Sequence, residues 1–186
     1  GGSPQLTDTV CATPSEQHDL IVASWEGQTD YKQSIPLTFE HALTAIKFKV
    51  GFDCKVTKLE VEGIYNSGTY TFGDGWEVNE ELTSGYVFNF GEKITDETTG
   101  TESYTKSEFK AGEFLTDGDN TLMMIPQTFL ESSDAKVRLT YIEGEETKII
   151  TSTLKNKVWQ EGKMITYTIH KTTAPTTIYF DLAAGN

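Results

Sequence analysis

Hydrophobic and polar residues alternate over much of the chain, and the clearest case lies within residues 37–50. Ile46, Phe48 and Val50 share one side of an extended strand, and the two lysines between them share the other side. A strand with this alternation buries one side and leaves the other in solvent. The pattern therefore predicts that this segment is a strand of a β core.

The residues just before that strand alternate with the opposite parity. Leu37 and Phe39 occupy odd-numbered positions, so one extra residue has to be absorbed before the strand continues. A β-bulge near residues 41–43 would absorb it and re-aim the strand. We therefore expect His41 to lie at a structural bulge and not in an active site. The side chains that we expect to be buried are Phe39, Leu43, Ile46, Phe48 and Val50.

Further alternating segments are separated by turns rich in Gly, Asn and Asp. The segments expected to be strands are 56–64, 70–72, 76–78, 83–90, 121–126 and 163–170. Residues 136–154 contain two alternating runs around Glu-Gly-Glu-Glu, which predict a hairpin. We expect 44–50 and 56–64 to form an antiparallel pair. Residues 91–108 lose the alternation and are expected to be an exposed loop.

Short strands at this spacing, rich in Val, Ile, Thr and Tyr, predict an all-β fold. We expect an antiparallel Greek-key β-sandwich of about seven or eight strands, with a closed barrel as the structural alternative. Residues 18–171 would form this domain. Residues 1–17 are a polar segment whose leading glycines are typical of an expression scar. Residues 172–186 are expected to be a linker followed by a final strand or the start of another module.

Charge narrows the choice of partners. The chain of 186 residues carries 15 Lys and Arg against 28 Asp and Glu, a net charge of −13. Phosphate-rich partners would be repelled, so we expect no nucleic acid and no anionic membrane as partner. No apolar run is long enough to cross a membrane as a helix, so the protein is not expected to be membrane-embedded. Residues 73–120 hold twelve of the acids and three lysines, which is typical of a solvated face.

The two cysteines, Cys11 and Cys54, leave two readings open. A disulfide between them would close a long loop and add about 4 kcal/mol of stability by the chain-entropy model. Two free, half-buried thiols fit the sequence equally well.

Candidate chemistry is sparse. The three histidines, His18, His41 and His170, are far apart in sequence and lie in no zinc-binding or metalloprotease motif. No Gly-x-Ser-x-Gly nucleophile elbow is present. Two Asp- and Gly-rich runs, at 73–75 and 117–120, could offer oxygen ligands to calcium, but such runs more often make turns. We therefore expect no catalytic residue, no cofactor and no metal site.

Aromatic residues offer one candidate binding site. Trp76, Tyr70 and Tyr86 could form a platform for a sugar ring, because amphipathic rings suit such ligands. The competing explanation is that these rings fill the core, as aromatic residues in strands usually do.

The sequence also resembles the fimbrillin-like proteins of Bacteroidetes, the group that contains the FimA-type and Mfa-type pilus subunits. The resemblance rests on four segments that occur in the same order as in the family. These are Asp-Leu-Ile-Val-Ala at 19–23, the Leu-x-Phe-x-His-Ala-Leu segment within 37–50, Met-Ile-Pro-Gln-Thr at 124–128, and Trp-Gln-Glu-Gly-Lys followed by Tyr-Thr-Ile within 159–169. Together they extend over residues 19–170.

The resemblance implies a transthyretin-like sandwich without catalytic activity, exported to the outer membrane surface or into a fimbrium. It implies a role in fimbrial architecture, anchoring or adhesion. The implied partners are neighbouring modules or fimbrial subunits, joined by a donated strand, and glycans or proteins of host or bacterial surfaces.

One departure from the family pattern bears on maturation. Pilins that mature by cleavage after arginine need an arginine near the start, and the sole arginine of this sequence is Arg138. Either the processing segment has been removed, or the chain is one module of a larger surface protein. The C-terminal segment 178–186, which begins an element that it does not finish, favours the second interpretation. The alternative function is a carbohydrate-binding β-sandwich module of a larger secreted protein.

Overall fold

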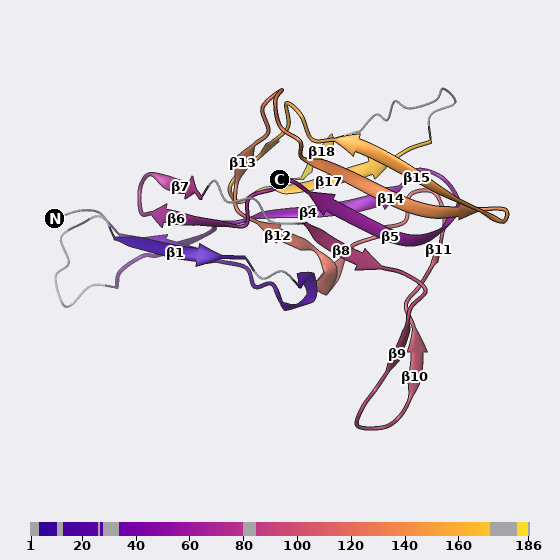
Figure 1. The fold of residues 1–186 in the computed structure, drawn as a ribbon. Helices are drawn as coiled ribbons and strands as arrows, with labels where there is room; N and C mark the ends of the chain where they lie inside the picture. Colours follow the sequence, from indigo (N-terminus) through magenta and orange to yellow (C-terminus); the bar gives the residue numbers. More distant parts are fainter. Residues whose placement is uncertain are drawn as a thin grey trace.

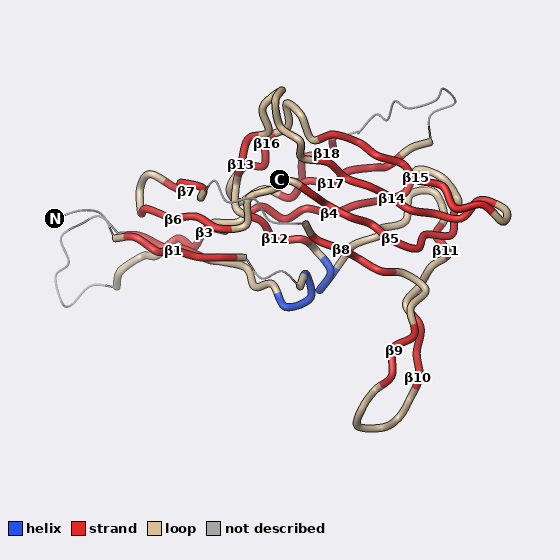
Figure 2. The backbone as a smooth tube through the Cα atoms, viewed as in Figure 1, coloured by secondary structure: helices blue, strands red, loops and turns tan. Residues whose placement is uncertain are grey.

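The computed structural model describes residues 4–10, 13–25, 27, 34–79, 85–171 and 182–185. Its regular structure there is almost entirely β, as Figure 2 shows. The exceptions are two single-turn 3₁₀ helices, η1 (Pro14–Glu16) and η2 (Gly118–Asn120). The all-β prediction is therefore confirmed.

Two sheets form the body of the molecule (Figure 1). The five-stranded sheet has the order β11 (Glu108–Phe109), β5 (Cys54–Glu62), β14 (Lys136–Glu143) and β15 (Glu146–Thr153), with β8 (Tyr86–Asn89) also paired to β5. The four-stranded sheet has the order β12 (Leu122–Met124), β4 (Thr44–Val50), β17 (Met164–Ile169) and β18 (Leu182–Gly185).

Smaller sheets extend from this body. A three-stranded sheet contains β1 (Gln5–Thr9), β6 (Ser67–Thr71) and β7 (Gly75–Val78). Three two-stranded ribbons are formed by β2 (Ile21–Ser24) with β3 (Thr38–His41), β9 (Lys93–Thr95) with β10 (Glu102–Tyr104), and β13 (Gln127–Thr128) with β16 (Val158–Trp159). The β1–β6–β7 sheet and the β9–β10 ribbon project from the sandwich in different directions (Figure 1).

The core lies between the two main sheets, because alternate side chains of their strands point inward. In β4 every second residue is buried, as the alternation of Ile46, Phe48 and Val50 predicts. The same core cluster contains Leu59 from β5, Leu139 from β14 and residues of β17. Burial of both inner faces is what a sandwich requires, and the described strands do not close into one barrel.

Two aromatic residues of the segment 159–169 lie at the end of the core. Trp159 is 1% exposed, packs edge-on against Phe129 at 4.8 Å, and donates its Nε1–H to the Tyr167 hydroxyl at 3.0 Å. Burial raises the pKa of Tyr167 to about 12. This indole and phenol therefore form a polar contact inside an apolar environment.

The structure corrects the predicted pairing of 44–50 with 56–64. β4 and β5 belong to different main sheets, and the loop at 51–53 carries the chain from one sheet to the other. A strand with one apolar side can pair next to its neighbour or face it across a core, so the alternation alone does not distinguish these arrangements. The long strand β17 pairs with β4 in parallel, so the sandwich is not purely antiparallel.

Two further expectations differ from the structure. Phe39 is 66% exposed, because β3 pairs with β2 outside the sandwich. The parity change occurs at a bend between β3 and β4, and the register irregularity lies instead in β5, near Thr57. The other predicted core residues, Leu43 among them, are buried.

Several strand predictions hold. The hairpin at 136–154 is formed by β14 and β15, and Tyr86 and Phe88 of β8 are buried together. The two main sheets contain nine strands in the described residues, against the expected seven or eight. Residues 91–108, expected to be a loop, contain the exposed β9–β10 ribbon, whose strands are too short to show a period.

Tyr167→Phe is expected to destabilise the protein by about 1–3 kcal/mol, because the buried Trp159 Nε1–H loses its acceptor. The matched control is Tyr104→Phe, at a side chain that is 66% exposed, where the change should stay within about 0.5 kcal/mol. Urea denaturation followed by tryptophan fluorescence measures both. Equal losses in the two variants would contradict the proposed role of this contact.

Candidate functional site

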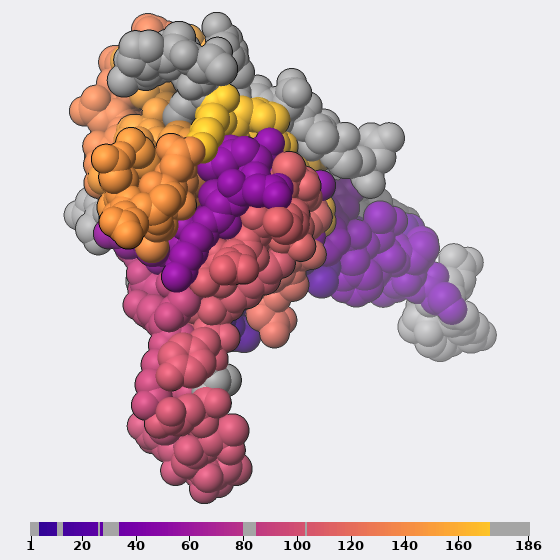
Figure 3. Space-filling model, turned by 90° about the vertical axis from the view of Figure 1, so that its right-hand side faces the viewer, coloured from indigo at the N-terminus to yellow at the C-terminus, as the bar shows by residue number. Residues whose placement is uncertain are grey.

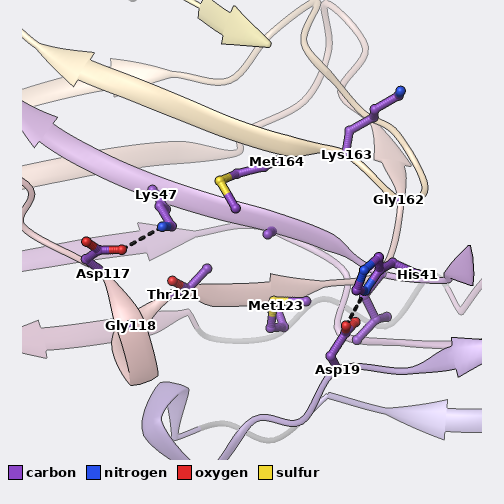
Figure 4. A pocket seen from close by; sticks show the side chains of 12 residues that line it. Asp19, His41, Lys47, Asp117, Gly118, Thr121, Met123, Gly162, Lys163 and Met164 are labelled. Atoms are coloured by element: carbon purple, nitrogen blue, oxygen red, sulfur yellow. Dashed lines mark hydrogen bonds and ion pairs between the residues drawn. The ribbon is translucent and has the colours of Figure 1, made fainter. Parts of the chain in front are cut away.

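A groove of about 610 Å³ lies on the outer face of the four-stranded sheet (Figure 4). Its lining comes from three neighbouring strands: Ala45 and Lys47 from β4, Met123 from β12 and Met164 from the start of β17. These positions alternate with the buried ones, so the strands that build the core also build the groove.

Charged pairs mark two ends of this groove. Lys47 Nζ lies 2.6 Å from Asp117 Oδ1, and this hydrogen bond lowers the pKa of the Asp117 carboxyl. At the other end, His41 Nδ1 contacts Asp19 Oδ2 (Figure 4). The lining between the pairs is mainly apolar, because both methionines and Leu43 contribute to it.

The His41 end of the groove is fixed by backbone hydrogen bonds from distant segments. Ala42 N–H donates to the Leu20 carbonyl at 2.8 Å, and Gly162 N–H donates to the Leu43 carbonyl at 3.0 Å. Trp76 Nε1–H donates to the Ala42 carbonyl at 2.6 Å. Three segments that are distant in sequence therefore form hydrogen bonds with the bend between β3 and β4.

Gly162 is required at this point for two reasons. Its φ is +67°, a conformation that side chains disfavour, and a Cβ there would lie 3.2 Å from the His41 carbonyl oxygen. The tight turn before β17 can thus approach the bend closely.

The β2–β3 ribbon adds an exposed apolar face next to the groove. Antiparallel pairing sets Ile21 opposite His41 and Ala23 opposite Phe39, so these four side chains share one face. Ile21 and Phe39 are both more than half exposed. Contiguous exposed apolar surface of this kind is typical of protein contacts. Because His41 lines the groove as well, the ribbon face and the groove meet at this residue.

The structure brings together two of the three candidate sugar-binding residues. The rings of Tyr70 and Trp76 meet edge-to-face at 5.4 Å beside a polar cleft of about 410 Å³. The Tyr70 hydroxyl donates to Glu161 Oε1 at 3.2 Å, and burial, with Glu40 adding to it, raises the pKa of Glu161. Tyr86 is 1% exposed and lies in β8 of the five-stranded sheet, whereas Tyr70 and Trp76 lie in the β1–β6–β7 sheet, so Tyr86 does not join this pair.

Other candidate chemistry can be placed within the described residues. No group of three or more His, Cys, Asp or Glu side chains there is arranged to hold a metal ion. Burial raises the pKa of the half-buried Cys54 thiol to about 11. The pairing with Cys11 lies outside the described residues. In the part of the chain that the structure describes, no helix has the length and apolar character needed to cross a membrane.

Comparison with protein families decides the classification. The fimbrillin-like family matches residues 3–181. The chain belongs to the fimbrillin-like family. A comparison with curated proteins finds no match.

Solved structures show the same fold as this fimbrillin-like chain. A fimbrial protein from Bacteroides vulgatus has a TM-score of 0.68 at 21% identity, over 99% of this chain and 68% of that one. A candidate cell adhesion protein from Bacteroides uniformis has a TM-score of 0.61 at 18% identity, over 98% and 65%. This chain therefore spans about two thirds of the length of these similar proteins.

The four segments that carry the family resemblance have structural explanations. Asp19 and Leu20 contact the residues at the bend, and Gly162 closes the same point. Gln127 is buried and bonds to the backbone of Tyr65 through both its amide nitrogen and its oxygen. The fimbrillin-like signature therefore marks the bend and the end of the core.

Sequence reasoning missed the groove. Its apolar lining comes from Met123 and Met164, at positions that alternate with the buried residues of β12 and β17. The sequence signal that could have indicated the groove is the presence of apolar side chains at positions that are expected to face solvent. Only the sheet order, which sets β12 and β17 on either side of β4, shows that they lie near each other.

Trp76→Phe is expected to destabilise the protein by about 1–2 kcal/mol, because the Ala42 carbonyl loses its indole donor. Trp25→Phe, at a side chain that is 43% exposed, serves as the matched control and should have little effect. Thermal unfolding compares the variants. If both tryptophans tolerate the change equally, Trp76 does not fix the bend.

Proposed function

We propose that this chain is a non-enzymatic module of a fimbrial or adhesin-type protein, exported to the cell surface, where it acts in fimbrial architecture, anchoring or adhesion. Membership of the fimbrillin-like family supports this role. The similar structures from Bacteroides vulgatus and Bacteroides uniformis share the fold, and their descriptions refer to a fimbrial protein and to cell adhesion.

The observation that carries the proposal is the apolar groove beside the bend. A groove lined by Met123 and Met164 leaves apolar surface in contact with water, and contact with a partner protein would remove it. The exposed face of the β2–β3 ribbon extends the same surface. We propose that a neighbouring subunit or module covers this region.

The edge of β12 supports strand donation as the mode of contact. In the described residues, β12 pairs with β4 on one side and with no further strand on the other. The Met123 N–H bonds instead to the Gln17 side-chain oxygen at 2.7 Å. A strand from a neighbour could replace this side chain as acceptor, extend the sheet and lay its side chains in the groove.

Met164→Glu tests this function in cells that produce the full-length protein. The charge at the 44%-exposed Met164 should leave the fold intact and exclude the protein from sheared fimbriae, because the neighbouring subunit would bury an unpaired carboxylate. Val87→Glu, at a 47%-exposed site of the other main sheet, is the control. Immuno-electron microscopy and fimbrial fractions measure incorporation.

The proposal predicts loss of incorporation for the Met164 variant and normal incorporation for the Val87 variant. Equal incorporation of both variants would contradict a role for the groove. Absence of the wild-type protein from fimbriae and from the cell surface would contradict the proposed function as a whole.

A carbohydrate-binding module is the second candidate. The contact of Tyr70 with Trp76, beside a cleft that contains Glu40 and Glu161, favours it because aromatic rings and carboxylates together suit sugar rings and their hydroxyls.

A glycan array with the wild-type domain and Glu161→Gln tests this candidate. Reproducible binding that the Glu161 variant reduces by about tenfold or more would support it, as expected for the loss of one charge-assisted hydrogen bond. The control is Glu131→Gln, at an exposed carboxylate outside the cleft. Absence of binding by the wild type would exclude the array glycans as ligands.

A further inference from the structure

The outer edge of β15 is open in the described residues. β15 is the terminal strand of the five-stranded sheet, has eight residues, and contains neither proline nor a register shift. Proline and β-bulges are features that proteins commonly use to protect an edge from another strand. Ile149, near the middle of β15, is 62% exposed. The edge is therefore suited to accept a further strand.

The hairpin geometry shows which backbone groups are available. A two-residue turn of Gly144, with φ of +64°, and Glu145 joins β14 to β15, and Glu143 pairs with Glu146. This closing pair exchanges hydrogen bonds, and bonded pairs alternate along the ladder. Residues 147, 149, 151 and 153 of β15 therefore direct their N–H and C=O groups away from β14.

The opposite edge of the same sheet carries a projecting arm. We define the arm as residues 91–107, which contain the β9–β10 ribbon and connect β8 to β11, both paired with β5. Figures 1 and 3 show the arm extending away from the sandwich. Two apolar side chains of the arm lie in solvent: Ile94 is 50% exposed and Tyr104 is 66% exposed.

Charge differs between these two edges. The arm contains four acids and two lysines. Residues 146–157, from the start of β15 to the turn after it, contain three lysines and one acid, although the chain as a whole carries −13. Lys155 and Lys157 follow β15 directly and have no carboxylate partner among the described residues. At the arm tip, the exposed Glu97 likewise has no basic partner there.

We propose that the arm of one copy packs along the β15 edge of a second copy, with Glu97 facing Lys155 and Lys157. The open backbone groups supply the pairing. Ile94 pairs with Ser103, so Ile94 and Tyr104 lie on opposite faces of the arm, and one of the two exposed side chains covers Ile149. Opposite charge is the reason for choosing a second copy as partner, because two molecules of −13 repel elsewhere.

The two surfaces lie at opposite edges of one sheet, so the contact is heterologous. A pair bound in this way still offers one free arm, on one copy, and one free edge, on the other, and the contact extends into a chain unless the rotation closes a ring. This inference rests on the proposed role as a fimbrial subunit, but it uses a surface separate from the groove at Met164.

A charge exchange in the full-length protein tests the contact. Glu97→Lys alone, and Lys155→Glu with Lys157→Glu, should each weaken self-association by about tenfold at low salt, because like charges then meet. Mixing the two variants, one supplying the arm and the other the edge, should restore association between them. Sedimentation velocity measures it at low and at physiological ionic strength.

A backbone variant tests the edge independently of charge. Ile149→Pro removes an N–H that points away from β14, so the hairpin should remain folded while association falls. Ile149→Thr keeps that N–H and is the matched control. Circular dichroism confirms that both variants fold.

The outcomes separate this inference from the proposed function. Loss with the proline but not with Glu97→Lys would mean that β15 pairs with something other than the arm, which overturns the proposal. No effect of any variant would also overturn it. If the Met164→Glu protein is excluded from fimbriae yet keeps this self-association, the groove contact and the β15 contact are separate, and both are supported.

Discussion

The bend at Ala42–Leu43 is the constraint on which the rest of the structure depends. Its backbone groups bond to Leu20, to the Trp76 indole and to Gly162, so that three segments far apart in sequence meet at one point. Peptide groups in such a buried bend need partners, and satisfying them fixes where β2, β7 and the turn before β17 must lie. The bend also frees β3 from the register of β4, so that the ribbon can leave the sandwich.

Once the bend is fixed, β4 has two different faces to present. Its inner side chains join the core, and its outer side chains line the groove between β12 and β17. Because β17 runs parallel to β4, the turn at Gly162 lies at the start of both strands and closes one end of that groove. The same residues thus contribute to stability and to the surface that we propose for assembly.

Sequence alternation predicts the strands well, because it reports directly which side of a strand is buried. It identifies Ile46, Phe48 and Val50 and the β14–β15 hairpin. It does not report which strands are neighbours, so the pairing of β4 with β5 is wrong and the parallel partner β17 is missed. Phe39 is misplaced because an apolar residue in a strand can face a core or a partner. The groove depends on sheet order, and the link between Trp76 and Ala42 depends on a contact across 34 positions that no local pattern contains.

We propose that a neighbouring subunit in a fimbrium covers the groove on the outer face of β12, β4 and β17. Cryo-electron microscopy of fimbriae isolated with the full-length protein tests it most directly. We expect a segment of a neighbouring subunit to run beside β12 with side chains in the groove near Met123 and Met164. Fimbriae that contain this protein with the groove open to solvent would show that no neighbouring subunit binds there.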